Sequence, residues 1–185
     1  MELIRCFLAI DPGESLRARL AALRGALAAH FSFPALRWVQ PSDYHLTLVF
    51  LGQVRADEIE RIHACVALLA PELHSLRYRL ASVQAFPDVH RPRVVAALPA
   101  DPQPFLCWQE PLAAALAGVG FSPERRAYRP HLSLGRWRSR LPCPQQEGFD
   151  LALDAEADAI TLYESRGGHY QPLFRECCAQ GCSGE

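Results

Sequence analysis

Two short segments of the chain repeat nearly the same four residues, HLTL at positions 45–48 and HLSL at positions 131–134. In a strand, side chains two positions apart lie on one face, so His45 projects beside Thr47. His131 and Ser133 form the same pair in the second copy. The leucines of each motif point the other way, toward a core. Each copy therefore presents an imidazole and a hydroxyl group together.

These side-chain types suit acid–base chemistry at a phosphorus centre. An imidazole titrates near neutral pH, so one histidine can take a proton from water while the other delivers a proton to a leaving oxygen. The hydroxyl groups can donate hydrogen bonds to the nonbridging oxygens, where negative charge must be stabilised. Two copies that face one cleft would supply an acid, a base and oxyanion donors without a metal ion.

A metal site is the main alternative use of His45 and His131. Neither motif contains Asp or Glu to complete the common ligand sets, so we expect no metal and no other cofactor. A single HLTL would more often be an ordinary strand with a surface histidine. The matching second copy makes the catalytic interpretation the better one.

The basic residues narrow the chemistry further. The chain has 185 residues and a formal net charge of -1, and all 19 of its basic residues are arginine. The absence of lysine excludes a Schiff-base lysine, a P-loop lysine and the adenylated lysine of an ATP-dependent ligase. Any phosphate held by charge must be held by arginine. Near-neutral charge favours a small or local substrate contact over a long nucleic-acid groove.

The seven cysteines are odd in number and lack paired CxxC spacing, which favours free thiols in a reducing compartment. The cluster of Cys177, Cys178 and Cys182 has no fourth metal ligand at suitable spacing. No apolar run is long enough for a signal sequence or a membrane span, so we expect a cytoplasmic protein without membrane contact.

The elements that must position the motifs follow from apolar patterning. Asp11-Pro12-Gly13-Glu14 predicts a helix start with Asp11 as N-cap, and a leucine stripe runs along that helix. The stripe consists of Leu16, Leu20, Leu23 and Leu27. Further helices are predicted at 59–69 and within 103–119, where Pro111 should kink the helix or mark the start of its better-formed half. Strands are predicted at 3–10, 37–39, 45–51, 74–86, 93–98, around 131, and at 151–154, 159–164 and 173–178.

Strands and helices alternate in the same order in both halves, and each motif follows a helix. This order predicts an α+β fold of mostly antiparallel sheet with two similar lobes that face each other. No linker divides the chain, so we expect a single domain over 1–185, with a loop near 141–144 and a flexible tail at 177–185.

Beyond the two motifs, longer stretches resemble a known family. They are FLAID at 7–11, RWVQPSDYHLTLVFLGQV at 37–54, AFP at 85–87, YRPHLSLGR at 128–136 and LYES at 162–165. Together they make the chain similar to the 2H phosphoesterases, in particular the RNA 2',3'-cyclic phosphodiesterases once called 2'-5' RNA ligases. The resemblance covers nearly everything from residue 4 to about 176.

The resemblance implies a bilobal fold with pseudo-twofold symmetry, outer helices and one motif on each side of a central cleft. It implies that His45 gives a proton to the departing ribose oxygen and that His131 takes one from water. Thr47 and Ser133 would hold the phosphate. The reaction would open a 2',3'-cyclic phosphate at an RNA end, or in a small cyclic nucleotide, and leave a 2'-phosphate. Since two lobes of one chain complete the site, we expect a monomer.

One further residue of interest follows each motif histidine at a distance of five positions. In similar enzymes such residues contact the nucleotide, so Phe50 could stack on it and Arg136 could bind phosphate. Strict strand alternation would turn both side chains away from the cleft. Only a bulge or a strand end, which Gly135 makes plausible for Arg136, would bring them back, and Phe50 could instead be a core residue.

Two alternatives to hydrolysis remain open from the sequence. The reverse reaction would join a 2',3'-cyclic phosphate to a 5'-hydroxyl and give a 2'-5' linkage with the same residues. A non-catalytic RNA-binding protein could keep the cleft without turnover, although intact histidines and hydroxyl groups in both motifs argue against it.

Overall fold

The computed structural model describes residues 2–122, 124, 126–138 and 148–179. Within this part of the chain, nine strands form one antiparallel sheet in the order β7-β4-β5-β6-β3-β1-β8-β9, and β2 pairs beside β6. The strands are β1 (Leu3–Ile10), β2 (Leu36–Trp38), β3 (Leu46–Arg55), β4 (Leu76–Phe86), β5 (Val94–Pro99), β6 (Leu132–Trp137), β7 (Phe149–Ala157), β8 (Ala159–Arg166) and β9 (His169–Cys177). The helices are α1 (Gly13–Ala22), α2 (Arg24–His30), α3 (Ile59–Leu69) and α4 (Gln103–Gly118), with the short 3-10 turns η1 (Pro41–Asp43), η2 (Ala56–Glu58) and η3 (Ala70–Glu72). The predicted α+β, antiparallel class is confirmed.

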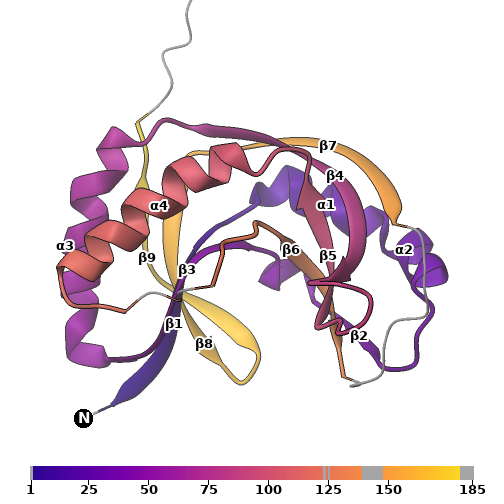
Figure 1. Ribbon diagram of the computed structural model, residues 1–185, viewed down its shortest axis with the longest axis horizontal. Helices are drawn as coiled ribbons and strands as arrows, with labels where there is room; N and C mark the ends of the chain where they lie inside the picture. The colour runs from indigo at the N-terminus through magenta and orange to yellow at the C-terminus, as the bar shows by residue number, and fades with distance from the viewer. Residues whose placement is uncertain (1, 123, 125, 139–147, 180–185) are drawn as a thin grey trace, which may run out of the picture.

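The sheet consists of two halves that meet where β3 lies beside β6. One half contains β1, β3, β8 and β9, and the other contains β2, β4, β5, β6 and β7 (Figure 1). From β1 the chain passes through α1, α2, β2 and η1 to β3, and from β5 it passes through α4 to β6. The strands that follow the two motif histidines are therefore equivalent in the two halves. The two lobes share one continuous sheet.

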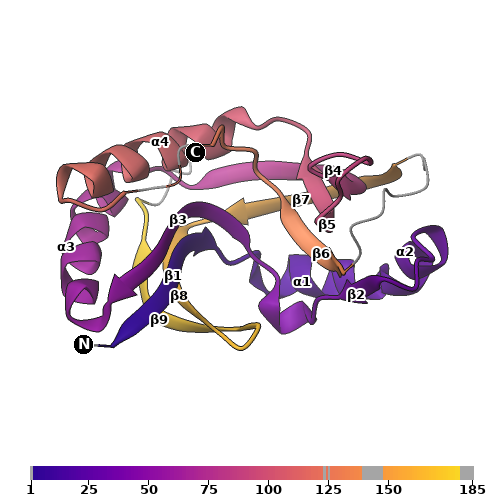
Figure 2. The same cartoon turned by 60° about the horizontal axis from the view of Figure 1, so that its bottom comes forward.

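The helices cover the sheet in two groups. α3 and α4 pack against each other beside β3 and β4, while α1 packs against β7 and η1 (Figure 2). On α4 the buried residues are Phe105, Trp108, Leu112 and Leu116. Their spacing of three and four residues places them on one face of the helix, which packs into the apolar core against the sheet.

Two helix predictions need correction. The first predicted helix is divided at Leu23 into α1 and α2, although its apolar stripe continues across the break. Its N-cap is Pro12, and Asp11 instead accepts a hydrogen bond from the backbone N–H of Gly13 at 2.7 Å. Gly13 has a φ of 74°, which departs from a regular helix start. The helix predicted within 103–119 is present as α4, and Pro111 lies inside it.

The chain after β8 returns as β9 and stays packed beyond its end. Cys178 is buried, and its N–H donates to the carbonyl of Asp158 at 2.7 Å. The N–H of Ala179 donates to the carbonyl of Leu73 at 2.8 Å. The first three residues of the expected tail are therefore part of the packed structure. Residues 180–185 and the loop expected near 141–144 lie outside the described residues.

No helix among the described residues has the length and apolar character needed to cross a membrane.

Candidate active site

The two motif strands meet at one pair of leucines. Leu46 of β3 lies opposite Leu132 of β6 in antiparallel register, and both side chains are fully buried. Each leucine directly follows a motif histidine in the sequence. The contact that joins the two halves of the sheet is therefore also the contact that joins the two motifs.

This register brings the polar residues of the motifs together. His45 and His131 come directly before these leucines, and Thr47 and Ser133 directly after them. The two histidines lie close enough that the charge of His131 lowers the pKa of His45. All four are partly exposed, while the leucines between them are buried. The four residues predicted from the repeated phrase thus form one cluster.

A bulge in β3 keeps Phe50 on the same face as this cluster. The register against β1 slips between Thr47 and Val49, so Leu48 is an extra residue in the strand. Leu48 and Val49 are both buried, and Phe50 is 41% exposed. The three-residue step from Thr47 to Phe50 therefore returns to the same face of the sheet. Phe50 is not a core residue.

β6 repeats this bulge at the same distance from its histidine. Its register against β5 slips between Ser133 and Gly135, with Leu134 as the extra residue. Leu134 and Gly135 are buried, and Arg136 is exposed. Both motif strands therefore contain a bulge, and the bulge reverses the orientation that strict alternation predicts for Phe50 and Arg136. We call the face that carries the cluster the site face, and its residues are His45, Thr47, Phe50, His131, Ser133 and Arg136.

Both histidines are held by the same backbone contact. The Nδ1 atom of His45 lies 2.8 Å from the carbonyl oxygen of Asp43, and that of His131 lies 2.8 Å from the carbonyl oxygen of Arg129. A carbonyl oxygen can only accept, so each Nδ1 must carry the hydrogen. In the neutral ring the Nε2 atom is then left as the proton acceptor.

Aromatic rings surround His45. Its ring lies 4.8 Å from that of Phe7 and 4.7 Å from that of Tyr170, which meets it edge to face. Burial lowers the pKa of His45 to about 4, although the hydrogen bond to Asp43 opposes this shift. The nearby positive charge of Arg136 lowers the pKa further. In the free protein at neutral pH, His45 is therefore uncharged.

His131 is packed on a different aromatic ring. Its imidazole stacks on Phe86 with the ring centres 4.2 Å apart, and the guanidinium of Arg129 lies 4.5 Å from the centre of the Phe86 ring. Burial lowers the pKa of His131, and the charge of Arg129 acts in the same direction. The histidines of the two halves thus share a tautomer and a direction of pKa shift, but they have different neighbours.

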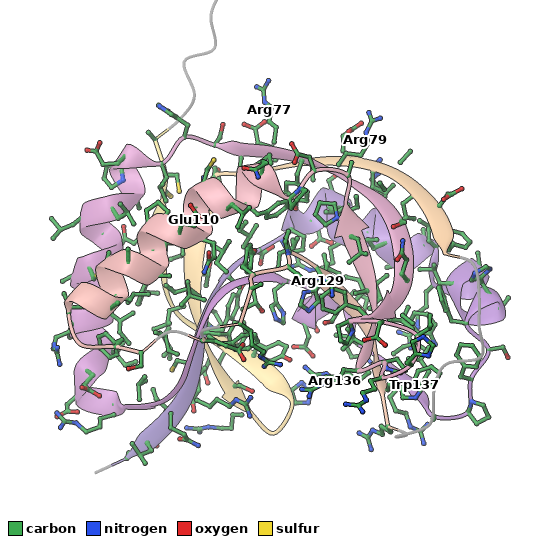
Figure 3. All side chains as sticks on the ribbon, in the orientation of Figure 1. Arg77, Arg79, Glu110, Arg129, Arg136 and Trp137 are labelled. Carbon is green, nitrogen blue, oxygen red and sulfur yellow. The ribbon has the colours of Figure 1, made fainter. Side chains whose placement is uncertain are left out.

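Tyr170 is a site residue that the sequence did not reveal. It lies near the start of β9, after a turn in which Gly167 and Gly168 both have positive φ, as two-residue hairpins require. Its ring packs edge to face on Phe7 at 5.1 Å, and its hydroxyl oxygen accepts a hydrogen bond from Arg136. Figure 3 shows Arg136 between the end of β6 and the β8–β9 hairpin. No local pattern distinguishes this tyrosine from other strand aromatics.

His169 comes next to Tyr170 at the tip of the same hairpin. Its side chain is 82% exposed. It nevertheless lies 3.6 Å from the carboxylate of Asp43, the residue whose carbonyl orients His45. The hairpin is therefore fixed to the first motif through Asp43 and to the second through Arg136.

The site face offers groups that bind anions. Among the described residues, no three His, Cys, Asp or Glu side chains lie close enough to hold a metal ion. The cluster instead combines two hydroxyl donors, two imidazoles and the guanidinium of Arg136. Such a set can bind phosphate oxygens and move protons at a phosphorus centre.

Comparison with known proteins places this geometry in context. Residues 10–96 match the family model described as LigT like Phosphoesterase. The RNA 2',3'-cyclic phosphodiesterase of Aeropyrum pernix is 32% identical over 164 residues, which cover 85% of this chain and 91% of the relative. The enzyme of the same name from Bacillus subtilis is 28% identical over 136 residues, 73% of this chain and 71% of the relative.

Solved structures agree over almost the whole chain. The crystal structure of TT0787 of Thermus thermophilus is 26% identical and has a TM-score of 0.81, covering 96% of this chain and 99% of the other. Escherichia coli LigT complexed with 3'-AMP is 25% identical with a TM-score of 0.78, covering 97% of this chain and 100% of the other. The likeness therefore extends over both motifs.

Proposed function

Because this chain belongs to the LigT-like phosphoesterase family, we propose that it hydrolyses RNA 2',3'-cyclic phosphate ends to 2'-phosphates without a metal ion. Membership makes it an enzyme of the phosphoesterase class. The observation that carries the finer proposal is the pairing of the two motif strands at Leu46 and Leu132. That pairing brings two histidines and two hydroxyl groups onto one face of the sheet. The Nε2 atom of each histidine is available for proton transfer.

The proposed reaction is a single displacement at phosphorus. Nε2 of His131 accepts a proton from a water molecule while the water oxygen forms a bond to phosphorus. The bond from phosphorus to the ribose 3' oxygen breaks, and Nε2–H of a protonated His45 gives that oxygen its proton. The product is a 2'-phosphate with a free 3'-hydroxyl. The two histidines exchange protons with solvent before the next turnover.

Thr47 and Ser133 act on the charge that develops during this step. Both hydroxyls lie on the site face with the histidines, so both can donate to the nonbridging oxygens held between the histidines. Arg136 offers a guanidinium on the same face, and the exposed ring of Phe50 can stack on a base. Ser133 offers the same kind of hydroxyl donor as Thr47.

Binding of the substrate favours the protonated form of His45. Its pKa of about 4 leaves it neutral in the free site. A bound phosphodiester carries a negative charge, which favours the imidazolium and raises the pKa. The assignment of His45 as donor and His131 as acceptor rests on the family resemblance, because the two motifs are alike in tautomer and hydrogen bonding.

Both halves of the site come from one chain, so the monomer is the expected active form. The substrate is proposed to be an RNA end or a small nucleoside 2',3'-cyclic phosphate. The free thiols among the described residues, including buried Cys6 and exposed Cys107, fit the reducing cytoplasm.

The test uses an unmodified nucleoside 2',3'-cyclic phosphate in the presence of EDTA, with products separated into 2'- and 3'-phosphates. The proposal predicts turnover that survives the chelator and gives only the 2'-phosphate. Loss of activity with EDTA would indicate a metal-dependent reaction. A 3'-phosphate product would mean that the 2' oxygen, and not the 3' oxygen, is the leaving group.

A further inference from the structure

Two arginines lie directly opposite each other beside the site. Arg37 of β2 pairs with Arg136 of β6 in antiparallel register. Residues paired in this way project from the same face of a sheet, with Cβ atoms about 4.5–5.5 Å apart. Since Arg136 is on the site face, Arg37 is there too, and both are exposed. Arg37 is thus the outer neighbour of Arg136.

This pair is unfavourable on its own. Like charges directly opposite on neighbouring strands destabilise a sheet. The strands β2, β4, β5 and β6 contain no Asp or Glu, and Asp43, whose charge acts on Tyr170 together with that of Arg136, lies 3.6 Å from His169. Among the described residues, Arg136 has a hydrogen bond to the Tyr170 hydroxyl, which is uncharged, and Arg37 has no ion pair. An anion between the two guanidiniums would remove the repulsion.

The close approach of β2 holds this arrangement in place. Gly135 lies opposite Trp38, one residue from the arginine pair. A Cβ at Gly135 would come within 2.8 Å of the end of the Leu36 side chain and 3.6 Å of the Arg37 carbonyl oxygen, so β2 packs closely against β6 at this point. Arg37 is therefore placed by strand pairing at the bulged end of β6.

The pair continues the site along β6. The motif strands meet at Leu132, and Arg136 comes four positions later in β6. A strand rises about 3.3 Å per residue, so the backbone of the arginine pair lies roughly 10–13 Å along β6 from Leu132, given the bulge between. The side chain of Arg136 reaches back toward the histidines, since it contacts Tyr170 and its charge lowers the pKa of His45, and Arg37 lies beyond it. An RNA chain that runs along β6 would bring the phosphate before its cyclic end toward Arg37.

We propose that Arg37, together with Arg136, binds the phosphodiester that precedes the cyclic end in single-stranded RNA, so that the physiological substrate is an oligonucleotide end. This inference rests on the proposed function and names its substrate class. The chain has no lysine and little net charge, so it would bind RNA locally, through one arginine pair beside the catalytic cluster.

The experiment compares kcat/KM for a nucleoside 2',3'-cyclic phosphate with that for a tetraribonucleotide that ends in the same group. Wild type is compared with Arg37→Gln and Arg37→Lys. The matched control is Arg77→Gln, which removes one exposed arginine from β4, where Figure 3 shows Arg77 pointing outward at the edge of the molecule opposite Arg136. Each assay is repeated over a range of salt concentrations.

Wild type is expected to prefer the tetranucleotide, and Arg37→Gln should lower the ratio of tetranucleotide to mononucleotide kcat/KM by about tenfold, the effect of one charged hydrogen bond. The slope of log(kcat/KM) against log[salt] for the tetranucleotide should become shallower by about 0.7, because one phosphate contact is lost. Arg37→Lys should restore the slope, and Arg77→Gln should leave both quantities at their wild-type values.

An unchanged ratio and salt slope in Arg37→Gln would overturn the inference, while mononucleotide turnover by wild type would still support the proposed function. If wild type turns over neither substrate, the proposed function fails. The fluorescence anisotropy of a labelled tetranucleotide then decides the role of Arg37, because the salt slope of Kd depends on the same phosphate contact and needs no turnover.

Discussion

The protonation of His45 gives a prediction that can be worked from the structure. With a pKa of about 4, only about one His45 in 1,000 is protonated at pH 7, against about one in four for an unperturbed histidine of pKa 6.5. The cause is burial among the rings of Phe7 and Tyr170, reinforced by the charge of Arg136. Binding of a phosphate anion acts in the opposite direction and should raise this pKa.

NMR titration of histidine ring nitrogens measures both states. In the free protein the midpoints of His45 and His131 should both lie below 6.5, that of His45 near 4, and both neutral rings should be the Nδ1–H tautomer. A saturating nucleoside 2'-phosphate, the expected product, should move the His45 midpoint upward by at least one unit.

Two results would refute this reasoning. A free-protein midpoint for His45 at or above 6.5 would mean that burial does not control its charge. An Nε2–H tautomer in either ring would mean that the backbone contacts of Nδ1 do not orient the histidines, and the proposed proton transfers would start from the wrong atom.

Three further predictions concern neighbouring side chains. Thr47→Val and Ser133→Ala should each lower kcat/KM for a nucleoside 2',3'-cyclic phosphate by about ten- to a hundredfold, because each removes one hydrogen bond to a charged phosphate. Tyr170→Phe should raise KM by about two- to tenfold with little change in kcat, because Arg136 loses the hydroxyl that holds it while the ring against His45 remains. Leu132→Ala should lower the free energy of unfolding in urea by about 2–5 kcal/mol, because a fully buried side chain is lost where the halves of the sheet meet.

Thermal melting controls the first two predictions, since a variant that melts like wild type has lost function and not fold. Wild-type kcat/KM in Thr47→Val would remove that hydroxyl from the mechanism. An unchanged KM in Tyr170→Phe would show that Arg136 needs no support from the hairpin. For the third, Leu68→Ala is the matched control, because Leu68 is 81% exposed and its loss should cost little.

The strands of the fold could be predicted because apolar runs and alternation mark them locally. Every predicted strand is present, although β3, β7, β8 and β9 extend beyond the predicted ranges. The break between α1 and α2 could not be predicted, because the leucine stripe continues through Leu23. The joining of both lobes in one sheet depends on contact between residues far apart in the sequence, and no local pattern encodes that contact.

The site shows the same division between local and long-range information. The placement of His45 beside Thr47 follows from the period of a strand. The bulges that turn Phe50 and Arg136 onto the site face follow from register against neighbouring strands, which a single segment does not reveal. Tyr170 reaches the site from a distant hairpin, so only the assembled sheet shows it.

The central claim is that the two motifs form one site, and hydrolysis of a nucleoside 2',3'-cyclic phosphate by four proteins tests it most directly. These are wild type, His45→Ala, His131→Ala and the double variant. Each single variant should lose about 10²- to 10⁴-fold in kcat, and the double variant should have a kcat close to that of the less active single variant, because acid and base act in one step. Wild-type activity in either single variant, or losses that multiply in the double variant, would contradict the claim.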